Sequence, residues 1–172
     1  MPSSEKRKRI KNIYKILEKK KLSGMLLFNR SMALNPNYFY FTGSKKTGFL
    51  IINKKSKKLY TFGKEKGAEE IKDLNELPKM KYKIGIDENR ITADLYKKLK
   101  KITKARFIDI SKELEELRAI KSKWEIKQIK NACKLKKKIY LEMKRNISKK
   151  QTELQLKAKI NEIFANHGVV EA

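Results

Sequence analysis

Hydrophobic residues near the start of the chain recur every three or four positions, at Ile10, Ile13, Tyr14 and Leu17. This spacing places them on one face of a helix. Residues 1–9 before them are polar and basic, and we expect this segment to be frayed. The apolar run at residues 25–28 is short and continuous, which is typical of a buried strand.

The next stretch changes from polar to aromatic. Residues 29–37 predict a loop, with turn chemistry at Asn35-Pro36-Asn37, and such loops are candidate functional surfaces. The four aromatic residues of Tyr38–Phe41 favour a strand. Alternation along that strand would place Tyr38 and Tyr40 on one face, which we interpret as core.

Two further apolar runs, at residues 48–53 and 59–62, flank a short lysine-rich turn. So short a connection predicts an antiparallel hairpin. Residues 66–73 then predict a short helix with Ala68 and Ile71 facing inward.

The segment from residue 83 to residue 110 predicts a strand, a helix and a second strand. Thr92 can cap the helix, and the two strands would be parallel neighbours joined by a crossover. Ser111 is expected to cap a further helix. These elements together predict an α/β fold with a mixed sheet flanked by helices.

Helical patterns alone follow this region. Ser122 and Glu125 form a capping box at the start of a helix that we expect to end near Arg145. Its apolar face contains Ile129, Ala132, Cys133, Ile139, Tyr140, Met143 and Ile147. Thr152 and Gln155 form a second capping box. We therefore divide the chain into residues 1–120 and residues 121–172.

The charge balance is strongly basic, with 45 Lys and Arg against 19 Asp and Glu, a formal net charge of +26. A basic chain suggests nucleic acid as a partner. The basic residues, however, are spread along the whole length, which is typical of a solvated lysine-rich surface. The single Cys excludes an internal disulfide, and no apolar run reaches the length of a membrane span. We expect a cytoplasmic protein.

Candidate catalytic chemistry is scarce. His167 is the only histidine and falls near the end of a helix, where no partner that could orient it is evident. Cys133 falls on the apolar face of its helix, so we expect it to pack in a core. One His and one Cys cannot supply the three or four ligands of an ordinary zinc site. We assign no catalytic residue and no metal ligand.

The run from Leu117 to Ala132, with the pattern Leu-Arg-x-Ile-Lys-Ser-x-x-Glu-Ile-x-x-Ile-x-x-Ala, resembles the entry into the pita-bread domain of the Xaa-Pro aminopeptidase, prolidase and creatinase family. The segment Asn37-x-x-Tyr40-Phe41-Thr42-Gly43 resembles part of the creatinase-type amino-terminal domain, with Phe41 where the family usually has an aliphatic residue. The resemblance implies a three-layer, ribonuclease H-like domain at residues 1–120. Residues 121–172 would then be the first helices of an incomplete pita-bread domain.

The resemblance also implies a function for a larger parent protein. Family members hydrolyse Xaa-Pro peptides with two divalent metal ions, such as Mn, Co or Zn, held by Asp, His and Glu ligands beyond the segment matched here. The chain would contribute to a homodimer and shape a substrate pocket, without catalysis by itself. Asn37, Tyr38 and Tyr40 are the residues that we expect to reach toward a partner subunit's pocket. The alternative is a stand-alone basic binding module for nucleic acid or an acidic partner.

Overall fold

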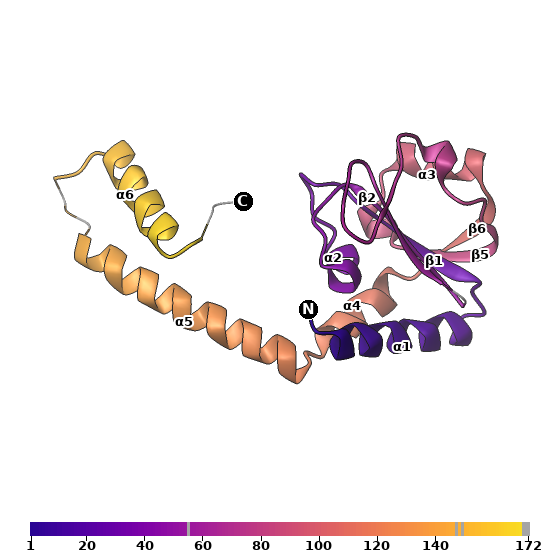
Figure 1. The fold of residues 1–172 in the computed structure, drawn as a ribbon, viewed down its shortest axis with the longest axis horizontal. Coiled ribbons are helices and arrows are strands. Elements are labelled where there is room, and N and C mark those ends of the chain that lie inside the picture. The colour runs from indigo at the N-terminus through magenta and orange to yellow at the C-terminus, as the bar shows by residue number, and fades with distance from the viewer. Residues whose placement is uncertain (55, 147, 149, 170–172) are drawn as a thin grey trace. The chain divides into compact units, whose positions relative to one another are not determined.

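A computed structural model describes residues 1–54, 56–146, 148 and 150–169. The chain divides into two compact units, Met1–Ile120 and Lys121–Ala172. Figure 1 labels their helices and the strands β1, β2, β5 and β6, and each unit is described by itself below.

The first unit is built on a six-stranded mixed sheet with the order β4-β3-β2-β1-β5-β6. The strands are β1 Gly24–Asn29, β2 Gly48–Asn53, β3 Lys57–Thr61, β4 Glu69–Glu70, β5 Lys81–Ile86 and β6 Lys104–Asp109. β2 pairs antiparallel with both β1 and β3, which confirms the predicted hairpin. β5 pairs parallel with both β1 and β6, as the predicted crossover requires.

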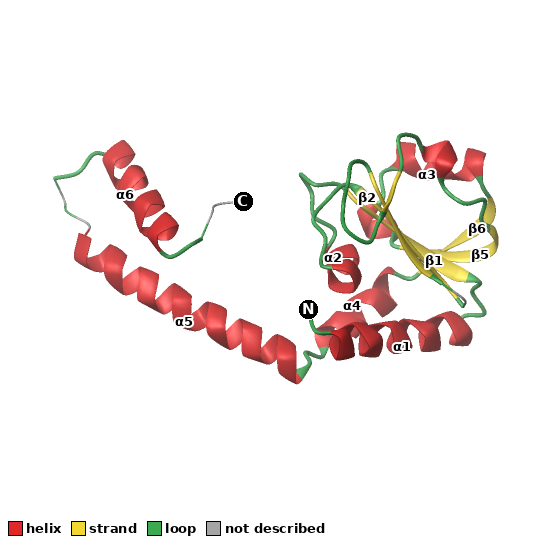
Figure 2. Ribbon diagram, in the orientation of Figure 1, coloured by secondary structure: helices red, strands yellow, loops and turns green. Residues whose placement is uncertain are grey.

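Four α-helices accompany this sheet: α1 Ser3–Lys19, α2 Pro36–Thr42, α3 Ala93–Ile102 and α4 Ser111–Ala119. Two short 3₁₀ segments lie at Leu74–Glu76 and Glu88–Arg90. The second unit contains α5 Lys123–Asn146 and α6 Glu153–Asn166. Figure 2 shows the helices and strands by colour.

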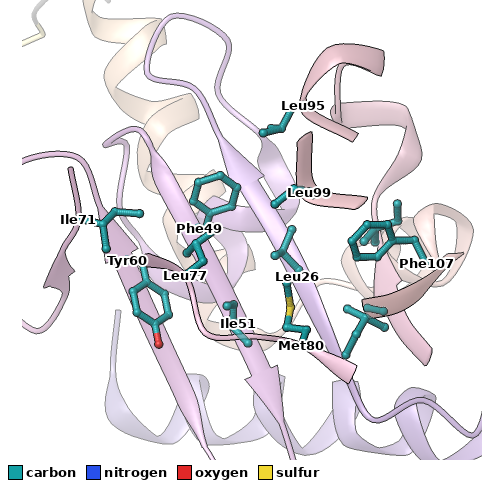
Figure 3. Close-up of a cluster of buried hydrophobic side chains, with 13 residues drawn as sticks. Leu26, Phe49, Ile51, Tyr60, Ile71, Leu77, Met80, Leu95, Leu99 and Phe107 are labelled. Carbon is teal, nitrogen blue, oxygen red and sulfur yellow. The ribbon is translucent and has the colours of Figure 1, made fainter. Parts of the chain in front are cut away.

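Hydrophobic side chains fill both faces of the sheet, because successive residues of a strand point to opposite sides. Leu26 of β1 belongs to a cluster that includes Leu95 and Leu99 of α3 (Figure 3). Its neighbours Met25 and Leu27 belong to a second cluster with side chains from α1, α2 and α4. The sheet is therefore the middle of three layers, which confirms the predicted fold class.

Both predicted capping boxes are present. The Ser122 backbone N–H donates to Glu125 Oε2 at 2.9 Å, and the Glu125 N–H donates to Ser122 Oγ at 3.2 Å. Thr152 and Gln155 make the same reciprocal pair at the start of α6. Ile147, assigned to the apolar face of α5 by its spacing, lies outside the described residues.

The predicted strand at Tyr38–Phe41 is wrong, because these residues form α2. Asn35 caps the helix with its side chain, Pro36 occupies its first turn, and Gly43 ends it with φ +75°. Three local signals for a helix thus override the strand preference of the aromatic residues. Tyr38 and Tyr40 do not share a face by strand alternation, although both are buried.

Other local expectations also need correction. Residues 1–9 are not frayed, since α1 begins at Ser3 and buries Arg9. Residues 66–73 form turns and the two-residue β4 rather than a helix, with Gly67 at φ +81°. Ser111 lies inside α4 and does not cap it, because Ile110 takes the capping position.

Candidate functional site

Two buried asparagines shape the segment between β1 and α2. Asn29 Nδ2 donates to the carbonyl oxygens of Lys45 at 3.1 Å and Lys46 at 2.9 Å. Asn29 Oδ1 accepts the backbone N–H of Asn35 at 2.7 Å. Asn35 Nδ2 in turn donates to the Phe28 carbonyl at 3.0 Å. These bonds tie the loop to β1 and to the backbone of residues 45–46, so they fix the conformation of the loop.

The loop between these asparagines is a tight turn. The Ala33 N–H donates to the Arg30 carbonyl at 2.9 Å, and the Ser31 N–H donates to Thr47 Oγ1 at 3.0 Å. The turn leaves the side chain of Met32 91% exposed. A large apolar side chain held outward by a fixed turn is a candidate contact for another polypeptide.

Asn37 connects α2 to two other elements. Its Nδ2 donates to Asp87 Oδ2, directly after β5, at 2.7 Å. Its Oδ1 accepts from Nε of Arg118, in the last turn of α4, at 2.6 Å. Because Asn37 is only 3% exposed, it acts within the unit as a bridge between α2 and α4.

The same network continues at the ends of β5 and β6. Ser111 Oγ lies 3.1 Å from Asp87 Oδ1 and also contacts Asp109 Oδ1. Its single hydroxyl proton can be donated to only one of these two carboxylates at a time. Asp109 also accepts the Ser111 N–H at 2.9 Å and the Glu88 N–H at 3.3 Å. Partial burial alone would raise the pKa of Asp109, but these hydrogen bonds and the charge of Lys20 hold it below its ordinary value.

Tyr38 lies in the interior of the first unit, with a side chain that is 0% exposed. Its hydroxyl has no hydrogen-bond partner of ordinary geometry in the described part of the chain. Burial raises the pKa of Tyr38 to about 12; nearby Ser44 opposes the increase and the charge of Glu65 adds to it. The hydroxyl therefore stays protonated near neutral pH and is poorly suited to act as a base.

Tyr40 is 9% exposed and packs against α1. The Arg9 guanidinium lies 3.9 Å from the centre of the Tyr40 ring, donates to the Tyr40 carbonyl, and pairs with Glu5 at 3.0 Å. The Tyr40 hydroxyl lies 3.5 Å from the Leu117 carbonyl of α4, a long contact. Asn37, Tyr38 and Tyr40 thus come together as the support that holds α2 in place.

Sequence reasoning missed the side chains that face outward from this support. Met32, Leu34 and Phe39 are 91%, 39% and 39% exposed, and we call these three residues the loop–α2 surface. The predicted strand would place Phe39 on the face opposite Tyr38 and Tyr40. Helical periodicity after the Asn35 cap would have separated Phe39 from the buried positions.

The second unit contains the remaining candidates. His167 follows α6, and its Nε2 lies 2.7 Å from Glu142 Oε2 of α5. Cys133 is exposed, so the expectation that it packs in a core is wrong. Across residues 1–54, 56–146, 148 and 150–169, no group of three or more His, Cys, Asp or Glu side chains could hold a metal ion. Within the same ranges, no helix is both long and apolar enough to cross a membrane.

The sequence of this chain matches a family profile and a curated relative. The profile of the Creatinase/Prolidase N-terminal domain matches residues 9–77 and 63–120. A curated relative, the Xaa-Pro dipeptidase of Pyrococcus horikoshii, is 24% identical over 176 residues. That alignment covers 93% of this chain and 48% of the relative.

Solved structures show the same fold. The prolidase of Pyrococcus horikoshii matches with a TM-score of 0.74 at 23% identity, covering 92% of this chain and 48% of that one. The X-Pro aminopeptidase of Thermotoga maritima matches with a TM-score of 0.77 at 20% identity, covering 92% and 49%. None of these relatives is named as a nucleic-acid-binding protein, so they give no support to the alternative of a basic binding module.

The chain spans about half the length of the curated relative that it matches. The family profile covers residues 9 to 120 without a gap, which is well over half of the chain. The chain therefore belongs to the Creatinase/Prolidase N-terminal domain family.

Proposed function

We propose that this chain serves as the amino-terminal portion of a proline-specific metallopeptidase of the Xaa-Pro dipeptidase or aminopeptidase type. The observation that supports this proposal is the extent of the alignment. It covers 93% of the chain, well beyond residue 120 where the family domain ends, yet only 48% of the dipeptidase. In this proposal residues 121–172 are the first helices of an incomplete pita-bread domain.

Catalysis would depend on residues other than those described. Two divalent metal ions, such as Mn, Co or Zn, would be the cofactors of the whole enzyme, as the family resemblance implies. The described side chains do not fit such a centre, because they offer no cluster of three or more ligating groups. We therefore assign this chain no step of the hydrolysis.

Its proposed contribution is to assembly and to the shape of the substrate pocket in a cytoplasmic homodimer. Asn37, Tyr38 and Tyr40 would act there through the loop–α2 surface that they support. The buried bonds of Asn37 to Asp87 and Arg118 favour this role, because they hold α2 rigidly to β5 and α4. A pocket wall supported in this way would keep its shape when a peptide binds.

The test is a peptidase assay on the chain alone and on a polypeptide that continues past Ala172 into a metal-binding half. With Mn²⁺, Co²⁺ or Zn²⁺ and an Xaa-Pro dipeptide, we expect proline release from the longer polypeptide only. Release by the chain alone, lost on chelation, would refute the proposal.

Variants of the longer polypeptide test the pocket. We expect Met32→Asp to raise KM several-fold, because it places a charge on the loop–α2 surface. Tyr82→Asp is the matched control, since Tyr82 is also an exposed apolar residue, at 75%, and lies in β5 outside the loop–α2 surface. If Met32→Asp and Tyr82→Asp have the same KM, the loop–α2 surface does not line the pocket.

A further inference from the structure

The first unit carries an open cleft at one end of its sheet, with a volume of about 740 Å³. Its lining comes from the end of α1, the connection to β1, the β2–β3 turn and the start of β5. Buried Leu17 and Leu22 contribute apolar surface, and the other lining residues are polar, charged or aromatic. A cleft of this size and mixed lining is within the range that holds small organic ligands.

The cleft lies away from the surface to which the proposed function gives a role. Asn53 in its lining pairs with Gly24 at the start of β1, whereas the loop–α2 surface follows Asn29 at the other end of that strand. Lys20 beside the cleft pairs with Glu113 in the first turn of α4, and the chain leaves the unit after the last turn. The first unit therefore forms this cleft with its own residues.

Hydrogen bonds fix the walls of the cleft. The Asn53 N–H donates to the Ser56 carbonyl at 2.9 Å, and the Ser56 N–H donates to Asn53 Oδ1 at 2.8 Å. On the opposite wall the Ser23 N–H donates to the Lys83 carbonyl of β5 at 2.8 Å. A site whose walls are held before a ligand arrives loses less conformational entropy when it binds.

Two residues of the cleft have backbone conformations that side chains disfavour. Lys21 has φ +53° and Tyr82 has φ +66°, and they are the non-glycine residues with positive φ in the described part of the chain. Lys21 occupies the left-handed position that follows α1, where glycine is usual. Strained residues of this kind gather at ligand sites, where the side chain has a use that glycine cannot supply.

The side chains of the cleft indicate the chemistry of a ligand. Tyr82 is 75% exposed and presents an aromatic ring, which can stack on a nucleobase. Lys21 and Lys54 are exposed, and no salt bridge within the described residues engages either one. An ammonium group is a compact charge that binds phosphate oxygens. Glu18, also exposed, can accept hydrogen bonds from sugar hydroxyls.

We propose that this cleft binds a nucleoside monophosphate. The base would stack on Tyr82, the phosphate would lie between Lys21 and Lys54, and Glu18 would accept from the ribose hydroxyls. Two lysines against one glutamate give the lining a positive balance, which suits the phosphate. The proposal does not depend on peptidase activity, and the peptidase assays contain no nucleotide, so Tyr82→Asp keeps its place as their control.

The test follows the backbone amide signals of the full ¹⁵N-labelled chain by NMR while adenosine monophosphate, adenosine or ribose 5-phosphate is added at constant ionic strength. We expect adenosine monophosphate to shift the amides of Ser23, Lys54 and Tyr82 saturably, with a Kd below about 1 mM. Adenosine and ribose 5-phosphate should each bind at least about tenfold more weakly, because each lacks one of the two main contacts.

Variants locate the ligand. Tyr82→Ala should weaken binding of adenosine monophosphate about tenfold, and Lys21→Gln about fivefold. Lys19→Gln is the matched control, since it removes the same charge from an exposed position of α1 that does not line the cleft. It should change the affinity less than about twofold, because salt screens the more distant charge.

A second substitution at Lys21 separates strain from binding. Lys21→Gly should raise the Tm by about 2 °C, because glycine adopts positive φ without strain, yet it should weaken binding as much as Lys21→Gln does. Lys21→Gln retains the strain and should leave the Tm unchanged. Unchanged binding in both variants would make Lys21 a helix end only and would overturn its role at the cleft.

Other outcomes would overturn the proposal as a whole. Shifts that spread over lysines of the whole chain and grow linearly with nucleotide would show adventitious adsorption to a basic surface only. Equal affinity for adenosine, or for ribose 5-phosphate, would remove one of the two contacts on which the proposal rests. Equal losses in Lys19→Gln and Lys21→Gln would place the ligand outside the cleft. Much tighter binding of a single-stranded oligonucleotide at the same amides would identify nucleic acid as the occupant instead.

Discussion

At the scale of single residues, Asp109 joins the end of β6 to the start of α4. Its carboxylate accepts the Ser111 N–H at 2.9 Å and the Glu88 N–H at 3.3 Å. These bonds favour the charged carboxylate, so the pKa of Asp109 is lower in the folded chain than in the unfolded chain. A group with a lowered folded pKa stabilises the fold above its unfolded pKa, near 4, and this contribution is lost as the pH falls through the folded pKa.

We therefore expect Asp109→Asn to lower the free energy of unfolding at about pH 7 by about 1 kcal/mol, a value reduced for solvent screening. At about pH 2.5 the difference from the unmodified chain should shrink, because the stabilising contribution of the charged carboxylate is lost as the pH falls through the lowered folded pKa. Urea unfolding followed by circular dichroism at the two pH values measures both differences.

Asp94→Asn is the matched control. Asp94 pairs with Lys98 at 2.8 Å, but both side chains are more than half exposed, so the substitution should have little effect at either pH. A loss for Asp109→Asn that is the same at both pH values would assign the effect to packing rather than to charge.

Some residues have roles that spacing along the sequence cannot reveal. Glu5 and Arg9 are read as solvent-exposed from their charge, yet they are 8% and 5% exposed and pair beneath the Tyr40 ring. Their burial depends on the packing of α1 against α2, a tertiary contact. The bridge from Asn37 to Arg118 joins residues 81 positions apart, which is likewise outside the reach of a local pattern.

At the scale of elements, α2 shows how capping decides between helix and strand. Asn35 Oδ1 accepts the N–H groups of Asn37 at 2.8 Å and Tyr38 at 3.2 Å. The aromatic side chains alone favour a strand, but a strand would lose both bonds and the left-handed end at Gly43. The local helix signals at Asn35, Pro36 and Gly43 therefore outweigh the strand preference of the aromatic residues between them.

Replacement of this cap should have a measurable cost. We expect Asn35→Ala to lower the free energy of unfolding by about 2 kcal/mol, because it removes the cap and leaves the Phe28 carbonyl without its donor. Thermal or urea unfolding of the full chain measures the change.

Asn89→Ala provides the comparison in the same unit. Asn89 is exposed, and its backbone N–H, which alanine keeps, donates to Ser111 Oγ at 3.4 Å. Its substitution should change stability by less than about 0.5 kcal/mol. Similar losses for Asn35→Ala and Asn89→Ala would contradict the importance of the α2 cap.

Much of the sheet could be predicted because its strands are apolar runs with clear ends. β1, β2, β5 and β6 all fall within a few residues of their predicted positions. β4 was missed because two glutamates carry no strand pattern, and pairing with β3 alone defines it. The capping boxes at Ser122 and Thr152 were found because their chemistry is local.

At the scale of the whole molecule, the two units differ in how much of their apolar surface they bury. The first unit has a hydrophobic cluster on each face of its sheet. In the second, Ile139 and Ile163 are the buried hydrophobic residues within the described part of α5 and α6. Local stability follows the density of buried contacts, so opening of the two units should cost different free energies.

Hydrogen exchange measured by mass spectrometry should reveal this difference. We expect amides of β1, β2 and β5 to exchange at least about a hundredfold more slowly than those of α5 and α6. If the amides of α5 and α6 exchange as slowly as those of β1, the second unit does not have the lower local stability expected here.

The position of β1 within the sheet has a consequence for the order of folding. β1 pairs with β2, which follows it closely in the chain, and with β5, which follows only after β3 and β4. As the polypeptide leaves the ribosome, the β1–β2–β3 meander can therefore form while the other edge of β1 still lacks a neighbour. Until Ile86 emerges, the backbone of Gly24–Leu26 is an open template for incorrect pairing, and a chaperone that covers this edge would protect the nascent chain.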